Sequence, residues 1–262
     1  MIALLSPALV GTVRYEFRMA TRTRVLWLAA VPLLALAALF ALVSPHPADS
    51  SSSQLIASWA LMVNLIATLG PGVALADRFA RDRALGLTDL LAATPANTTV
   101  RMVGTLVGSL AAALAPAAVL LLGVGVAVAV VRRDPAALGW ALVALVGVVL
   151  PAALQLVTFA AAAGSLLPVP FARVATVFVW LWATVLNTRL IPVPTITGTL
   201  LSPLGDYVTF GWLHGDRLWA GRGWSVLSPA PTALTALLNI AAVLAVAGVF
   251  FTAARLIAAQ RR

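Results

Sequence analysis

The chain has 262 residues, of which 62% are hydrophobic and 10% are charged, and its formal net charge at pH 7 is +9. Soluble domains carry about 25% charged residues, and a chain with a mean hydropathy of +1.03 has too few polar side chains to cover a globule. The composition therefore predicts an integral membrane protein and excludes a soluble one. The chain has no cysteine, which excludes disulfides and thiolate metal sites.

All 17 basic residues are arginine. A basic charge balance also occurs in nucleic-acid-binding proteins, but here the arginines flank apolar runs, where membrane topology places positive charge. We therefore expect no nucleic-acid partner. The two histidines, His46 and His214, lie far apart in polar connections, so we expect no metal site.

Residues 8–24 have the periodicity of an amphipathic helix. Arginines recur every four residues on one arc, beside an arc of apolar side chains, which is typical of a helix lying along the inner leaflet. The alternative is an ordinary basic flank that only sets the topology. The apolar arc holds Val10, Val13, Phe17 and Ala20, and the basic arc holds Arg14, Arg18 and Arg22.

Six apolar runs approach or exceed the ~20 residues that a helix needs to cross a bilayer core of ~30 Å. The first run is longer than the apolar core of about 7–15 residues in a signal peptide, so it counts as a span. We expect an all-α integral membrane protein in which residues 1–262 form one transmembrane domain. The spans cover residues 25–43, 55–75, 102–131, 136–163, 173–192 and 231–254.

The arginine distribution predicts the orientation of these spans. With the N-terminus inside the cell, twelve arginines fall in inner segments and five in outer segments. Because positive residues concentrate on the cytoplasmic side of a membrane, we expect both termini in the cytoplasm. The predicted location is a bacterial-type cell membrane, crossed several times.

The stretch RDRALGLTDLLAATP, residues 81–95, separates the second and third runs. Gly86 is a natural helix end, and Thr88 can cap a new short helix with Asp89 in its first turn, where the helix dipole favours negative charge. Several leucines gather at this short helix. Two interpretations remain open, a cytoplasmic helix that docks on a partner and a loop whose leucines dip into the lipid surface.

Polar side chains and small residues interrupt the spans at a few positions. The polar groups serve either as contacts between helices or as part of a pathway or a dimer interface, because a lone amide in lipid is costly. The pairs Gly104 with Gly108 and Ala160 with Gly164 permit close helix packing. The intramembrane polar residues are Asn64, Thr68, Gln155, Thr158, Asn187 and Asn239.

The connection over residues 193–230 is long for a structureless loop, and many of its residues are apolar. We expect one or two short helices that re-enter the outer leaflet. Trp212, Trp219 and Trp224 would then lie at the water boundary, where tryptophan is enriched.

The stretch 81–95 resembles the segment between spans two and three in permease subunits of type-2 (ABC-2-like) ATP-binding cassette transporters. That family often has Glu-Arg-Glu-x-Gly-Thr, then an acid, leucines, and a proline nine residues after the glycine. The matching positions are Asp82, Arg83, Gly86, Asp89, Leu91 and Pro95, with Thr88 beside the usual threonine position, whereas Ala84 and Leu87 depart from the pattern. The order of the elements and LSPLGDYV, residues 201–208, resemble the family as well.

The resemblance implies a coupling helix seated in a groove of a separate ABC ATPase subunit. It implies a permease that pairs with a second permease chain, of the same or another kind, in the lipid bilayer. ATP and Mg would be bound by the ATPase chains. The implied ATPase-coupling interface is Asp82, Arg83, Gly86, Leu87, Thr88, Asp89, Leu90, Leu91 and Pro95.

The residues themselves predict no catalytic activity and no cofactor in this chain. A P-loop requires a lysine to reach the phosphates, and the chain has none. No nucleophile has a base and an orienting group arranged around it in the sequence. ATP hydrolysis is therefore expected on the partner chain.

The leading hypothesis is a permease that exports an amphiphilic or lipophilic substrate, because the spans carry no fixed charge at mid-depth and an unpaired ion there is costly. Two alternatives stay open. The same architecture could transmit ATPase motion to an outer partner without moving a substrate, or the chain could be a secondary carrier or membrane scaffold.

Overall fold

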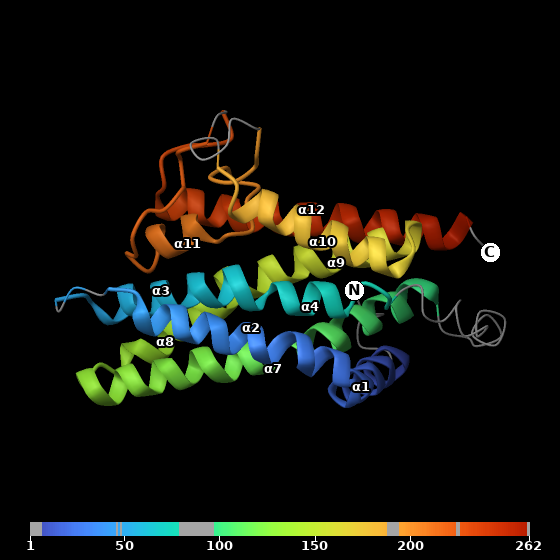
Figure 1. The fold of residues 1–262 in the computed structure, drawn as a ribbon, viewed down its shortest axis with the longest axis horizontal. Helices are drawn as coiled ribbons and strands as arrows, with labels where there is room; N and C mark the ends of the chain where they lie inside the picture. Colours follow the sequence, from blue (N-terminus) through green and yellow to red (C-terminus); the bar gives the residue numbers. More distant parts are fainter. Residues whose placement is uncertain are drawn as a thin grey trace.

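The computed structural model describes residues 7–45, 47, 49–78, 97–187, 194–223 and 226–260, and in this part of the chain every regular element is a helix. The long helices run side by side along the longest axis of the molecule (Figure 1). Five helices are long and apolar enough to cross a membrane. They are α2 (Arg24–Val43), α3 to α4 (Ser52–Ala74), α7 (Thr98–Arg132), α8 to α9 (Ala136–Leu166) and α12 (Ala233–Gln260). Five apolar helices suggest a multi-pass membrane protein, and they lie close to the bounds of five of the six predicted spans.

Two of these five helices contain a π-helical segment. The first helix consists of α3 (Ser52–Met62), η2 (Val63–Ala67) and α4 (Leu69–Ala74). The second consists of α8 (Ala136–Ala144), η3 (Leu145–Val149) and α9 (Leu150–Leu166). Segments of this kind loosen the regular hydrogen-bond ladder and are frequent at functional sites. Both of them lie beside the long connection before α12.

The predicted span 173–192 is represented by α10, a helix of 16 residues over Val169–Thr184. It is shorter than the ~20 residues that a full crossing needs, and residues 188–193 lie outside the described part of the chain. The hydroxyls of Thr197 and Ser202 donate to the carbonyl oxygens of Trp182 and Ala183 over 3.1 and 2.9 Å. These bonds satisfy carbonyls at the end of α10, so the helix stops where the next segment packs against it.

Helix α1 (Pro7–Arg22) lies across one end of the bundle, at the same end as the last residues of α12 (Figure 1). It packs against the first half of α7. In the predicted apolar arc, Ala20 is buried, whereas Val10 and Phe17 are exposed. A helix is therefore present over these residues, and its amphipathic character and its position along the inner leaflet stay a prediction.

The predicted pair Gly104 and Gly108 permits close packing against α1, and Gly164 of the second pair lies against the turn that follows α4. A Cβ atom added at Gly108 would lie 2.5 Å from the carbonyl oxygen of Val13 in α1, and one added at Gly104 would lie 2.7 Å from Thr12. At Gly164, a Cβ atom would overlap the carbonyl oxygen of Ala76. Side chains at Gly104 and Gly108 would push α1 and α7 apart, and one at Gly164 would displace the turn after α4.

Candidate functional site

The connection between α10 and α12 folds over and into the end of the bundle opposite α1 (Figure 1). It includes the short helix α11 (Asp206–Gly211), which packs against α3, η3 and α12. Two backbone hydrogen bonds join distant parts of the connection. The Leu200 N–H donates to the Leu227 carbonyl oxygen over 2.8 Å, and the Gly221 N–H donates to the Gly198 carbonyl oxygen over 3.1 Å. The expectation of a folded connection with a short helix is met. Its depth in the outer leaflet stays a prediction, and Trp224 lies outside the described residues.

Two of the predicted intramembrane amides hold this connection in the bundle. The Nδ2 group of Asn64, in η2, donates to the carbonyl oxygens of Pro203 and Leu204, each over 2.8 Å. The Nδ2 group of Asn239, in α12, donates to the carbonyl oxygens of Leu200 and Ser202 over 2.8 and 3.1 Å. Both amides are almost completely buried. They satisfy carbonyls of an irregular segment that is cut off from water, which a stable fold requires.

The other four predicted polar residues are buried as well. The Thr68 hydroxyl donates to Oδ1 of Asn64 over 3.1 Å, which orients that amide toward the connection. The Thr158 hydroxyl donates to the carbonyl of Leu154 in its own helix over 2.8 Å. The amide oxygen of Gln155 has no hydrogen-bond partner. Thus the structure brings Asn64, Thr68 and Asn239 to the same connection, whereas the Thr158 hydroxyl bonds within its own helix.

Gly205 precedes α11 and allows the connection to approach η3. Its φ of +78° lies in the left-handed region, which residues with a Cβ adopt at a cost. A Cβ atom here would also lie 2.5 Å from Cγ1 of Val148. Glycine is required at this position for both reasons.

Asp206 opens α11, and its carboxylate accepts from backbone N–H groups in the following loop. Its Oδ1 accepts from Leu218 over 3.2 Å, and its Oδ2 accepts from Trp219 and Ala220. Burial raises the pKa of Asp206 above its ordinary value, and the three N–H groups oppose part of that rise. The carboxylate therefore holds residues 218–220 against the start of α11 by three hydrogen bonds.

Tyr207, the next residue, also holds parts of the connection together by hydrogen bonds. Its ring is 1% exposed, and its hydroxyl lies 3.2 Å from the carbonyl oxygen of Gly198 and 3.1 Å from that of Pro229. The hydroxyl also accepts from the Gly221 N–H over 3.0 Å. Burial raises the pKa of Tyr207, so the phenol stays protonated and donates at neutral pH.

At the opposite end of the bundle, α1 is joined to the residues that flank the segment 79–96. Oε2 of Glu16 lies 3.5 Å from Nη1 of Arg78, the last described residue before that segment. The Thr105 hydroxyl, near the start of α7, donates to Oε1 of Glu16 over 3.4 Å. One carboxylate therefore contacts the chain both before and after the predicted coupling stretch. The predicted coupling residues Asp82, Arg83, Gly86, Leu87, Thr88, Asp89, Leu90, Leu91 and Pro95 lie outside the described residues.

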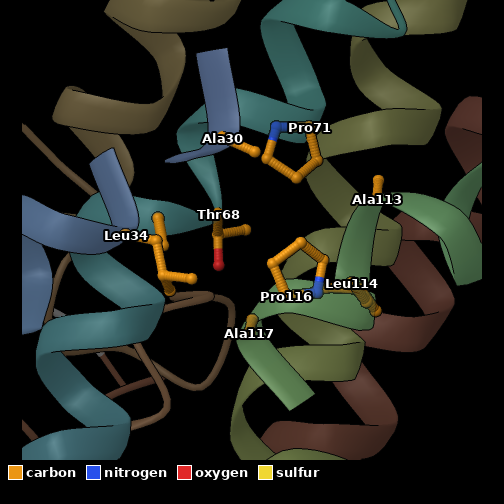
Figure 2. A pocket seen from close by; sticks show the side chains of 9 residues that line it. Ala30, Leu34, Thr68, Pro71, Ala113, Leu114, Pro116 and Ala117 are labelled. Carbon is orange, nitrogen blue, oxygen red and sulfur yellow. The ribbon is translucent and has the colours of Figure 1, made fainter. Parts of the chain in front are cut away.

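A narrow pocket lies between α2, α4 and α7, beside Thr68. Figure 2 shows Pro71 and Pro116 facing it from different helices, with Leu34 on another side. Its volume is about 10 Å³, room for at most about one water molecule. The pocket is a small packing gap and has no room for a substrate.

Within the described residues, no group of three or more His, Cys, Asp or Glu side chains could hold a metal ion. Comparison of the chain with protein-family models and with curated proteins gives no match.

Proposed function

We propose that the chain is the membrane subunit of an ATP-driven exporter of the type-2 ATP-binding cassette class. It carries no catalytic group of its own, and a separate ABC ATPase subunit, with ATP and Mg bound, supplies the energy. Support comes from the motif in residues 81–95 together with a bundle of long apolar helices and a helix lying across one end.

The observation that carries this proposal is the contact of Glu16 with Arg78 and Thr105. A partner that pushes on the segment 79–96 acts on the chain at Arg78 and at the start of α7. Glu16 ties both places to α1, so α1, α4 and α7 respond to the push together. A free surface loop would need no such connection.

The proposed topology has both termini and the segment 79–96 in the cytoplasm of a bacterial-type cell. The last helix ends at the same end of the bundle as α1 (Figure 1). In this arrangement the folded connection between α10 and α12 faces the outside. A second permease chain packs against the exposed apolar helix faces in the bilayer.

The proposed substrate is amphiphilic or lipophilic. A pocket of about 210 Å³ between α9, α10 and α12 is lined almost entirely by apolar side chains. An ion entering such a site would lose its hydration without a countercharge, at a cost of several kcal/mol. An apolar molecule gains roughly 25 cal/mol per Å² of buried surface.

The test is substrate flux in inverted vesicles that contain the chain and its ATPase. ATP-dependent accumulation of a lipophilic substrate, absent when ATP is replaced by a non-hydrolysable analogue, is the expected result. ATP hydrolysis without flux of any substrate in a broad lipophilic panel would instead favour mechanical transmission to an outer partner. Flux that follows an ion gradient and ignores ATP would favour a secondary carrier.

A further inference from the structure

The apolar pocket of about 210 Å³ has a well-defined wall of aromatic rings. Phe159 of α9 and Phe250 of α12 meet edge to face, with ring centroids 5.2 Å apart. Trp180 and Trp182 of α10 line the pocket as well. Both α10 and α12 pack on α9, so the pocket lies over α9, and residues of the connection line it as well.

The indole N–H groups of both tryptophans already donate hydrogen bonds, whereas the amide oxygen of Gln155 has no partner. The indole N–H of Trp180 donates to the carbonyl of Leu65 over 2.8 Å, and that of Trp182 donates to the carbonyl of Pro194 over 2.9 Å. Gln155 also lines the pocket, is 7% exposed, and has an amide oxygen without a partner. A buried acceptor left unpaired costs free energy, so a ligand that supplies a donor there gains from pairing it.

We propose that this pocket binds a small lipophilic molecule carrying one hydroxyl or N–H donor, and that Gln155 accepts from that donor. The last torsion of a glutamine side chain is soft, so the amide can turn its oxygen toward the pocket when the ligand enters. The rings enclose the apolar body of the ligand. The selected chemistry is thus an alkyl-substituted phenol or an alcohol of similar size.

The volume of the pocket limits the size of the ligand that it can hold. A cavity of about 150 Å³ holds benzene, whereas pockets for drug-sized ligands measure about 300–1,000 Å³. At about 210 Å³, this pocket suits one ring with a short alkyl substituent, or the equivalent part of a larger amphiphile. A lipid acyl chain would also fill it, but it would leave the Gln155 oxygen unpaired.

The test is photolabelling of the purified full chain in lipid nanodiscs with two matched reagents. One is an aryl trifluoromethyl diazirine with a hydroxymethyl group, and the other carries a methyl group at that position. Mass spectrometry locates the labelled residues. We expect labelling at Phe159, Val246 and Phe250 to be about tenfold stronger with the hydroxymethyl reagent, and 4-propylphenol to suppress it.

Two sets of variants control for general effects on folding. Gln155→Leu should reduce labelling by the hydroxymethyl reagent to the level of the methyl reagent. Val246→Trp fills the pocket and should abolish labelling there, whereas Val249→Trp, on the exposed side of the same helix, should leave it unchanged. Equal labelling by both reagents in the unaltered chain would overturn the proposal and mark a groove for acyl chains. Labelling spread evenly over the lipid-facing helices would overturn it by showing that no site exists.

This proposal deepens the proposed function by naming a site for its substrate class, and it is tested without an ATPase. Failure of the labelling experiment leaves the export proposal intact. Failure to capture an ATPase leaves a ligand pocket of the stated chemistry.

Discussion

Glu16 and Arg78 form an ion pair of 3.5 Å between α1 and the turn that follows α4, with side chains that are 15% and 8% exposed. Breaking such a pair leaves a buried charge without its partner, which costs about 3 kcal/mol or somewhat less at this degree of burial. The pair therefore fixes α1 against the bundle.

A double-mutant cycle measures this connection. Glu16→Gln, which can keep the hydrogen bond from Thr105, and Arg78→Gln should each lower the Tm in detergent. The double variant should be less destabilised than the sum of the two, by about 1 kcal/mol or more. Strict additivity of the two single effects would show that the ion pair contributes nothing.

The contact of α1 with Gly108 gives an independent test of the same arrangement. Gly108→Val should push α1 away from α7, because its Cβ would lie 2.5 Å from the Val13 oxygen. Amide hydrogen exchange in residues 7–22 should then become faster. Gly123→Val is the matched control on the same helix, because a Cβ there meets no atom within 4 Å. Equal exchange in both variants would contradict the packing of α1.

The side-chain amide of Asn64 donates hydrogen bonds to two backbone carbonyls in the connection before α12. Asn64→Leu should leave the carbonyls of Pro203 and Leu204 unpaired, at about 1–3 kcal/mol each, and should clearly lower the Tm. Gln155→Leu is the matched control, because its amide oxygen has no partner. The anchoring role of Asn64 is wrong if the two variants lose the same, small amount of stability.

The hydrogen bonds of Asp206 to the following loop can be tested by limited proteolysis of the chain in lipid nanodiscs. Asp206→Ala removes the acceptor for three backbone N–H groups, so residues 214–223 should detach and be cut faster by added protease. Asp216→Ala, an exposed aspartate in the same connection, should be cut as slowly as the unaltered chain. Slow cutting of both variants would show that the carboxylate does not hold the loop.

The five long helices were predictable because hydropathy alone determines where a chain of this composition can cross a membrane. The end of α10 was not predictable. Its last carbonyls bond to hydroxyls 15 and 19 residues further along the chain, and no local pattern reveals that contact. The apolar run continues past Thr184, so the sequence indicated a longer helix than the one that forms.

The sequence predicted which amides of the candidate site are buried, but it did not predict which groups they bond. Burial of Asn64 and Asn239 follows from the cost of an amide in lipid, but their partners lie 139 and 39 residues away. The role of Asp206 was missed. Its signal is a lone acid directly after a glycine within an apolar connection, which suits a carboxylate that accepts from backbone N–H groups. The Glu16 contact was missed as well, because its partners come from distant segments.

The most direct test of the central claim is purification of the tagged chain from its own membranes in mild detergent, followed by identification of the proteins bound to it. The account predicts an ABC ATPase subunit in near-stoichiometric amount. The variant with both Leu90→Asp and Leu91→Asp should insert normally but lose that subunit, since each charge placed in an apolar groove costs a few kcal/mol. Recovery of the ATPase at full yield by that variant, or purification of the unaltered chain without any ATPase, would contradict it.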